Sequence, residues 1–398
     1  MSKLNSKETL KLKKFSLIPI LEGLDIYLNF SIITFLSYFF LPHIDNRASL
    51  IVMTCVVLLS FFSRLFVMTI IKVFQNLEKK IRSNIFFICS LFYIIPIFLL
   101  NEFLTISLII FSLCRLLTGI CLSCVHFSEL TSKDFKNESN YFIKYSLLFI
   151  FGLILGNFIF LIVDDLLSIE QMNNWGWKIV YFCLFVMSLI IAFITKIKFK
   201  SIFFDFKSLN EIEESNTSLK LVPNILKNIF ILLPLFVFLI FSSNYWLPRF
   251  ANPENMQFLD FNLILIFLIV LMNIFVFPLI NLIGRKRSNN FLSTSVIFVS
   301  LILFLFEYTS SYSIEMLKFF VAIVSSFSLS IYFLNMPKIK EINPADLIKV
   351  HNSFFLIIFF IVPLLFYYFI NYSISYNVIY LLTGLIFLIS FLSGKYVK

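Results

Sequence analysis

The chain has 398 residues, of which 60% are hydrophobic and only 14% are charged. A soluble domain carries about a quarter charged residues, so this composition excludes an ordinary soluble protein. The formal net charge of +10 would suit a nucleic-acid partner, but the placement of the cations along the chain, described below, argues against that interpretation.

Apolar runs that are long enough to cross a hydrocarbon core of about 30 Å as helices recur along almost the whole chain. We therefore predict an all-α membrane protein with twelve transmembrane helices. They cover residues 15–41, 49–71, 84–100, 103–127, 141–163, 177–195, 225–247, 259–280, 290–306, 317–336, 350–370 and 375–393. An even number of spans places both termini on the same side of the membrane.

A long polar stretch, which includes SLNEIEESNTS, divides six predicted helices from the other six. It is too short for a folded catalytic domain and is typical of a linker between two bundles. The predicted organisation is an N-terminal six-helix bundle over residues 1–197, a cytoplasmic linker over 198–224 and a C-terminal six-helix bundle over 225–398.

The cations sort to one side of this predicted topology. Most of the 32 Lys and Arg residues fall on the side of the termini, whereas the opposite loops hold mainly acidic residues. The positive-inside rule then places both termini in the cytoplasm, as expected for a bacterial inner-membrane protein. The basic charge is explained by topology, so we expect no nucleic-acid partner. The three tryptophans, Trp175, Trp177 and Trp246, are predicted at the outer interface.

A short basic segment occurs once in each half of the chain. QNLEKKIRSN (75–84) and INLIGRKRSN (280–289) share Asn-Leu, a cation four residues after the Asn, an Arg six residues after it and a closing Ser-Asn. Each copy follows the second predicted helix of its half, on the cytoplasmic side. A duplicated unit of this kind is the build of transporters that rock two bundles about a central site.

This repeated segment resembles the signature loop of the major facilitator superfamily, roughly Gly-x-x-x-Asp-x-x-Gly-Arg-x-Lys/Arg. Asn76 and Asn281 take the position of the Asp, Lys80 and Arg285 take that of the Arg, and Gly284 keeps the glycine in the second copy only. In the family the Asp takes part in a charge relay with neighbouring helix ends, and both copies here lack it.

The first half of the chain is similar to one branch of that superfamily, the metabolite:proton symporters, which include proline/betaine transporters. NWGWKIVYF (174–182) resembles the Asp-Trp-Gly-Trp-Arg-Ile-Pro-Phe-Phe element at the start of helix 6 in that branch. LEGLD (21–25), Arg64, RLLTG (115–119) and GLILG (152–156) resemble elements of helices 1, 2, 4 and 5. The Gly-Gly-Glu that follows the helix 4 glycine in the family is Ser123-Cys124-Val125 here.

Two acidic residues lie on one face of the first predicted helix. Glu22 and Asp25 are separated by three positions, and a charge inside a spanning helix costs about 2.5–3.5 kcal/mol unless it faces a cavity or a partner. Two neighbouring carboxylates do not both ionise readily, so we predict that the pair couples transport to protons. The alternative is that they form salt bridges with Arg64 or Arg115 and fix the packing.

The resemblance implies that helices 1, 4, 7 and 10 line a central cavity. Arg115, near the middle of the fourth helix, would there meet the carboxylates or bind a carboxylate of the solute in a bidentate contact. The other predicted cavity residues are Tyr27, Asn244, Tyr245 and Ser325, with aromatic faces suited to an ammonium group and packing as the alternative role. Gly152 and Gly156 form a small-xxx-small face for close helix contact.

The function that the resemblance implies is proton-coupled uptake of a small zwitterionic solute, such as proline or glycine betaine, by alternating access. The alternatives are transport or efflux of another small metabolite, an inactive homologue, and a polytopic membrane enzyme. The six cysteines follow no metal-binding spacing. We therefore expect no enzymatic activity, metal or cofactor; the expected partners are the lipid bilayer, a proton and a small solute, and the protein is expected to act as a monomer.

Overall fold

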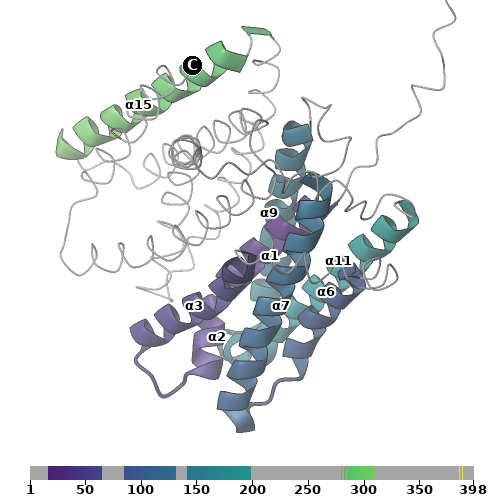
Figure 1. Cartoon of the computed structure of the whole chain (residues 1–398). Coiled ribbons are helices and arrows are strands. Elements are labelled where there is room, and N and C mark those ends of the chain that lie inside the picture. Colours follow the sequence, from purple (N-terminus) through teal and green to yellow (C-terminus); the bar gives the residue numbers. More distant parts are fainter. Residues whose placement is uncertain are drawn as a thin grey trace, which may run out of the picture.

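The computed structural model describes residues 17–64, 85–130, 141–198 and 285–309, together with residues 279, 282–283, 385 and 388 (Figure 1). All regular secondary structure in these described ranges is helical. The remaining predicted helices of the second half lie outside these residues, apart from isolated positions. The division into two six-helix bundles with a linker therefore stays a prediction.

The first six predicted spans correspond to helices in the structure. The first span is α1 (Ile18–Ser31) followed by α2 (Ile33–Phe40), the second is α3 (Asn46–Arg64), and the third is α6 (Ile85–Ile94) with the 3-10 turn η1 (Ile95–Phe98). After the 3-10 turn η2 (Asn101–Phe103) come α7 (Leu104–Leu130), α9 (Tyr141–Leu166), α10 (Ile169–Gln171), the π-helical turn η3 (Met172–Gly176) and α11 (Trp177–Lys198). In the second half, α15 (Arg285–Thr309) corresponds to the predicted span 290–306.

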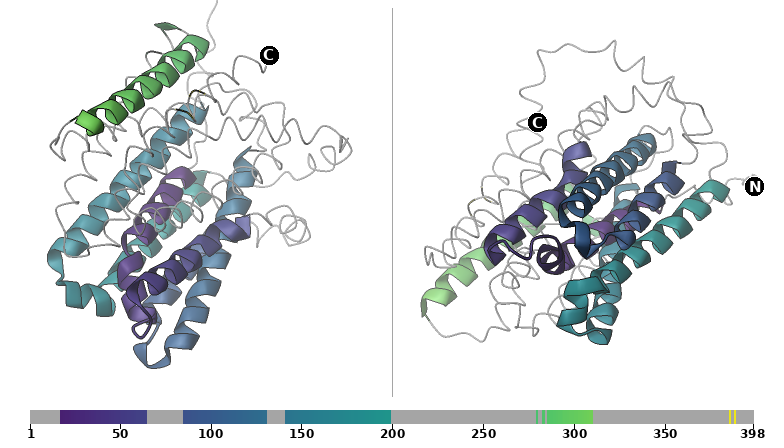
Figure 2. Two further views of the ribbon diagram at one scale, coloured as in Figure 1. Left: turned by 90° about the vertical axis from the view of Figure 1, so that its left-hand side faces the viewer. Right: turned by 90° about the horizontal axis from the view of Figure 1, so that it is seen from below.

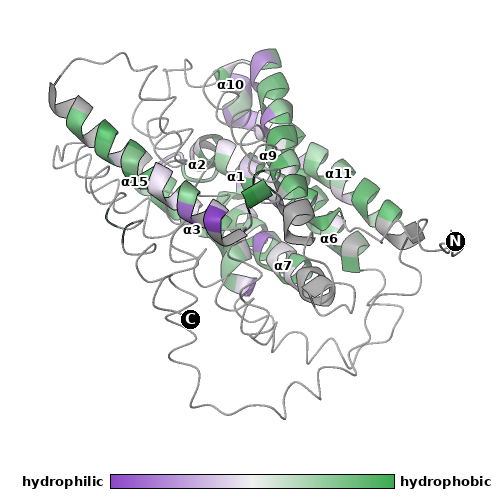
Figure 3. Cartoon of the chain, turned by 90° about the horizontal axis from the view of Figure 1, so that it is seen from above, coloured by the Kyte–Doolittle hydropathy of each residue, from purple (hydrophilic) through white to green (hydrophobic). Residues whose placement is uncertain are grey.

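Several of these helices have the length and composition of membrane spans. Among the described residues, the stretches Asn101–Ser123, Leu147–Leu166 and Ile169–Ile194 are long and apolar enough to cross a membrane, and α1 with α2 forms a fourth, bent candidate. Hydrophobic residues extend along α9 and α11 (Figure 3). Large apolar side chains such as Leu113, Phe158 and Phe193 are exposed on the outside of the helices, which suits a surface that faces lipid.

Helix α1 lies in the interior of the first-half helices. Of its fourteen residues only Phe30 is not buried, because α1 contacts α9 along its length and also touches α3, α7 and α11 (Figures 1 and 2). Helix α7 packs against α3, and α6 packs against α7 and α11. Since α1 also carries Glu22, Asp25 and Asn29, its central position requires that these polar side chains find partners on the surrounding helices.

Close helix contacts depend on glycines. A Cβ atom on Gly152 of α9 would lie 2.2 Å from the carbonyl oxygen of Ile20, and one on Gly23 of α1 would lie 2.2 Å from that of Phe149. On the other side of the bundle, a Cβ on Gly119 of α7 would lie 1.9 Å from the carbonyl oxygen of Ser60 on α3. No larger residue fits at such distances, so these glycines set the approach of the backbones.

The first span is bent, which the sequence did not predict. Helices α1 and α2 meet at an angle of 54°, and neither Pro nor Gly lies at the break around Ile32. One helical turn earlier, the Asn29 side chain donates through Nδ2 to the backbone carbonyl of Asp25 at 2.8 Å. Bonds of this kind also occur within α7, where Ser112 and Thr118 bond to carbonyls four residues back and the helix continues, so the Asn29 bond alone does not explain the break.

Candidate functional site

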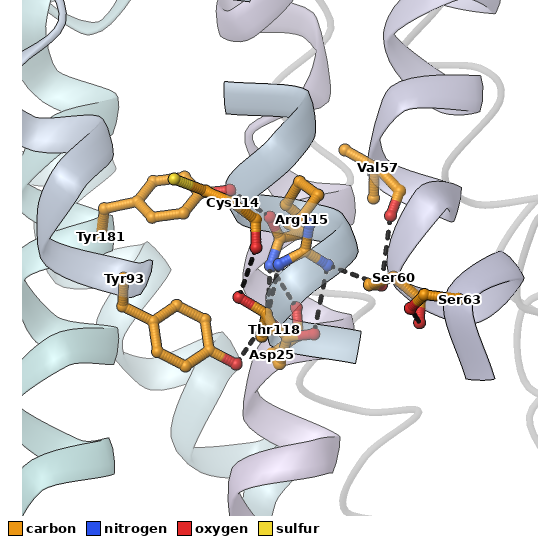
Figure 4. A network of polar contacts seen from close by, with 10 residues as sticks. Asp25, Val57, Ser60, Ser63, Tyr93, Cys114, Arg115, Thr118 and Tyr181 are labelled. Carbon is orange, nitrogen blue, oxygen red and sulfur yellow. Dashed lines mark hydrogen bonds and ion pairs between the residues drawn. The ribbon is translucent and has the colours of Figure 1, made fainter. Parts of the chain in front are cut away.

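A buried ion pair joins α1 to α7 in the middle of the first-half helices (Figure 4). Arg115 donates through Nη1 to Oδ1 of Asp25 at 2.8 Å and through Nη2 to Oδ2 at 3.2 Å. Asp25 is 0% exposed and Arg115 is 1% exposed. This bidentate contact pairs the two charges inside the protein, where an unpaired charge would be costly.

Asp25 also accepts hydrogen bonds from two uncharged side chains. The Tyr93 hydroxyl on α6 donates to Oδ1 at 2.9 Å, and Nδ2 of Asn29 donates to the same oxygen at 2.9 Å. Arg115 in turn donates through Nη2 to Oγ of Ser60 on α3 at 3.0 Å. An ionised carboxylate accepts about four hydrogen bonds and donates none, so these donors suit the charged form of Asp25.

Asn29 connects this carboxylate to α11. The Tyr181 hydroxyl donates to Oδ1 of Asn29, while the amide nitrogen of Asn29 bonds to Asp25. The side chains of Asp25, Asn29, Ser60, Tyr93, Arg115 and Tyr181 therefore form one polar network, which we call the Asp25 network. Its members come from α1, α3, α6, α7 and α11. A change in the charge of Asp25 would therefore alter contacts among all five helices.

A second ion pair lies one helical turn before the first. Arg64, the last residue of α3, pairs through Nη1 with Oε1 of Glu22, and both side chains are buried. The Arg64 guanidinium also lies 4.7 Å from the ring centre of Phe61. Glu22 and Asp25 are three positions apart on α1, and each pairs with a different arginine.

Tyr27, predicted to line the cavity, points to the other flank of α1. Its hydroxyl donates to Oδ1 of Asn157 on α9, and its ring packs against Gly156, where a Cβ atom would lie 3.0 Å from the Cβ of Tyr27. Asn157 is fully buried. Within the described part of the chain its Nδ2 atom has no hydrogen-bond partner.

The NWGWKIVYF stretch forms η3 and the start of α11. A capping box precedes it, because Gln171 and Ser168 bond to each other's backbone N–H groups. A Cβ on Gly176 would lie 2.6 Å from the sulfur of Met172 and 2.7 Å from Cδ1 of Leu167, so a larger residue here would require these side chains to shift. Lys178 donates through Nζ to the carbonyl oxygen of Leu99 at 2.6 Å, which ties the start of α11 to the residue that follows η1.

Trp177 was predicted at the membrane interface, and that expectation is wrong for its side chain. The indole is 0% exposed and packs against Phe39, Phe40, Phe111 and Tyr181, with ring centres 4.9–6.5 Å apart. Its neighbour Trp175 is 44% exposed. The two indoles are two positions apart, which is a rotation of about 200° around a helix, so they lie on different sides and only one of them faces the outside.

The other predicted site residues belong mostly to parts that the structure does not describe. Outside the described residues lie Asn76, Lys80, Asn281, Gly284, Asn244, Tyr245, Trp246 and Ser325. Arg285 is the first residue of α15, so this helix begins five residues before the predicted start at 290. The basic residues of the second repeat copy therefore lie in the first turn of a helix, where we had expected a loop.

Sequence analysis missed Asn29, Ser60, Tyr93, Asn157 and Tyr181. Asn29 alone had a local signal, since it follows Asp25 by four positions and so lies on the same face of the helix. Among the described residues, no group of three or more His, Cys, Asp or Glu side chains is placed to hold a metal ion.

Comparisons with known proteins show which fold the chain has. No protein-family model matches the chain, and no curated protein matches it. Among solved structures, that of the proton:xylose symporter XylE bound to 6-bromo-6-deoxy-D-glucose is similar with a TM-score of 0.69, covering 96% of this chain and 95% of that chain at 14% identity. The chain has the major facilitator fold.

Further solved structures agree with this fold. XylE from E. coli in a partially occluded inward open conformation has a TM-score of 0.63 at 15% identity, covering 97% of this chain and 99% of that one. FucP in an outward conformation has a TM-score of 0.60 at 14% identity, covering 96% and 97%. The predicted fold class is therefore confirmed as a multi-pass helical membrane protein of the major facilitator fold, while identities this low bear on the fold alone.

Proposed function

We propose that the protein is a proton-coupled secondary transporter that carries a small solute across the membrane by alternating access. The major facilitator fold supports a transport role. The observation that carries the proton coupling is the buried, bidentate ion pair of Asp25 with Arg115. An ionisable residue within a membrane span is by default a functional one. Protonation of Asp25 would change the hydrogen bonds and the ion pair of the Asp25 network.

Protonation of Asp25 alters the interactions that hold five helices together. A neutral carboxyl group no longer balances the charge of Arg115, and a buried arginine that loses its counter-charge favours a conformation in which it gains another partner or water. Asp25 also accepts from Tyr93 and Asn29, so its protonation affects α6 and α11 as well. A proton thus favours one packing of the helices over another, which is what coupling requires.

The Glu22–Arg64 pair is the second proposed coupling element. It connects the beginning of α1 to the end of α3, so it would hold these helix ends together in one state and release them in another. In this proposal Asp25 binds the transported proton and Glu22 stabilises the conformation shown here. This pair also fits the alternative role given to the carboxylates in the sequence analysis, in which salt bridges to the arginines fix the packing.

The proposed solute is small and has no net charge. In the described residues the two buried arginines each face one carboxylate, so their formal charges cancel. A zwitterion such as proline or glycine betaine, which the resemblance of the N-terminal sequence suggests, meets this condition. A sugar meets it too, and it is the second candidate because XylE, a structural neighbour, is a proton:xylose symporter.

The proposed setting is the bacterial inner membrane, with the protein acting as a monomer and both termini in the cytoplasm. The concentration of Lys and Arg on the side of the termini supports this orientation. Efflux of another small metabolite remains an alternative direction for the same machinery. A membrane enzyme receives no support from the structural neighbours, whose names are those of transporters.

Purified protein in liposomes with an imposed pH gradient tests this function. Labelled proline, glycine betaine and D-xylose are offered outside liposomes whose lumen is more alkaline. We expect one of them to accumulate only while the gradient lasts, and Asp25→Asn to abolish accumulation while leaving exchange of labelled for unlabelled solute. Accumulation by wild-type protein that does not depend on the gradient would reject proton coupling.

A further inference from the structure

The contact between α1 and α9 contains an amide group that is only half satisfied. Asn157 is 0% exposed, and the Tyr27 hydroxyl donates to its Oδ1 atom. Its Nδ2 atom, with two hydrogens to donate, has no hydrogen-bond partner in the described part of the chain. Buried amide donors almost always have a partner, and leaving one without any is costly, so this N–H group is available for a hydrogen bond to a bound molecule.

Asn157 lies on the opposite flank of α1 from the proposed proton site. Tyr27 follows Asp25 by two positions, which is a rotation of about 200° around a helix. Asp25 therefore faces Arg115 and Tyr93, whereas Tyr27 faces Asn157 on α9. A single buried helix carries the carboxylate on one side and contacts the unsatisfied amide on the other.

The spacing of α1 and α9 changes along their contact. One turn before Tyr27 the two backbones touch, because Gly23 lies against the carbonyl of Phe149 and Gly152 lies against that of Ile20. At Gly156 the ring of Tyr27 separates them instead. The half-satisfied amide thus lies next to the place where the Tyr27 side chain, and not direct backbone contact, separates the two helices.

We propose that Asn157 is a solute-binding residue, whose amide N–H donates a hydrogen bond to an acceptor oxygen of the transported solute. This inference rests on the proposed transport function. The acceptor is the carboxylate of a zwitterion or a hydroxyl of a sugar. Tyr27 is a positioning residue, because its bond to Oδ1 fixes the amide so that the N–H end remains for the solute.

A neutral donor fits the charges of the described residues. Both buried arginines are already paired with carboxylates, so a solute carboxylate bound near Asn157 would not have to separate an ion pair. Glycine betaine offers only its carboxylate as an acceptor and has no donor, whereas D-xylose offers hydroxyl groups. Uptake of these two probes therefore distinguishes the two sources of the acceptor oxygen.

The first test measures KM for labelled glycine betaine and for D-xylose in liposomes, with Asn157→Leu as the variant. Leu keeps the branched outline of the Asn side chain and has no hydrogen-bonding group, although it is somewhat larger. For the probe that wild-type protein transports, we expect KM to rise about tenfold, the effect of one lost hydrogen bond to a solute, and Tyr27→Phe to raise it less. Asn101→Leu, at an exposed position of η2, is the matched control and should keep the wild-type KM.

The results separate this inference from the proposed function. Gradient-driven uptake by Asn157→Leu with an unchanged KM would overturn the inference and leave proton coupling intact. A raised KM for uptake that does not depend on the gradient would support the inference and reject the coupling.

A second test does not require that the solute be known. In Asn157→Cys, a hydrophilic methanethiosulfonate reagent should modify the new thiol, because a solute-binding position must meet water during transport. Phe158→Cys is the matched control: this neighbouring side chain is 58% exposed on the apolar outer surface and should resist the reagent, as should the six cysteines of the wild-type protein. Absence of modification at position 157 in folded protein would overturn the proposal, even if neither probe is transported.

Discussion

Replacing Asp25 with Asn removes the charge opposite Arg115 and keeps the size of the side chain. The variant leaves a guanidinium that is 1% exposed facing a neutral amide, with Ser60 as its other described partner. Removing one member of a buried ion pair costs about 3–5 kcal/mol, because the remaining charge is uncompensated. We therefore expect Asp25→Asn to lower the free energy of unfolding by about that amount.

The double variant Asp25→Asn with Arg115→Met isolates the interaction from other effects of substitution. It removes both charges, so it should be more stable than Asp25→Asn alone, and the two single losses should not add. The measurement is unfolding in mixed detergent micelles, followed by circular dichroism. Glu22→Gln serves as a comparison, because it removes the carboxylate that pairs with Arg64 in the other ion pair of α1.

This experiment also bears on coupling, since a protonated Asp25 resembles Asn in charge and shape. If Asp25→Asn destabilises the protein as expected, then a proton on Asp25 disfavours the conformation described here by a similar amount. Strict additivity of the two single changes, or an Asp25→Asn protein as stable as wild type, would refute the reasoning. Either result would show that the pair does not hold this conformation.

The remaining predictions concern the supports of the site. Tyr93→Phe removes one hydrogen bond to a charged carboxylate and should cost about 1.5–3 kcal/mol in the same unfolding assay; a wild-type value would show that the hydroxyl contributes nothing. Gly119→Ala places a methyl group 1.9 Å from the carbonyl oxygen of Ser60, so the yield of monodisperse protein in size-exclusion chromatography should fall severely, whereas Thr105→Ala at an exposed position of α7 should match wild type. Lys178→Met removes the bond to the Leu99 carbonyl and should lower stability by about 1–2 kcal/mol, measured by thermal unfolding; an unchanged melting temperature would exclude this role.

The helices could be predicted from the sequence because a membrane span needs an uninterrupted apolar run of known length. The same reasoning could not find the bend after α1, since neither Pro nor Gly marks it in the sequence. The early start of α15 at Arg285 was missed because charged residues can begin a helix as readily as they fill a loop.

The candidate site was predictable only where a charge lay within an apolar run. Asp25 and Arg115 stood out for that reason, and the sequence analysis named both as possible partners. Tyr93 and Tyr181 did not stand out, because they are two of 16 tyrosines in a chain rich in aromatic residues. Their role follows from the packing of α6 and α11 near α1, which no pattern within a single helix contains. Asn157 is likewise explained only by its position opposite Tyr27.

The most direct test of the central claim is to measure proton movement with solute in liposomes that contain a pH-sensitive dye. Addition of the transported solute outside should acidify the lumen when wild-type protein is present, since each solute molecule would enter with a proton. Asp25→Asn protein should produce no acidification while still exchanging labelled for unlabelled solute. If the Asp25→Asn protein acidified the lumen as strongly as the wild-type protein does, the account would be contradicted, because a residue other than Asp25 would then carry the proton.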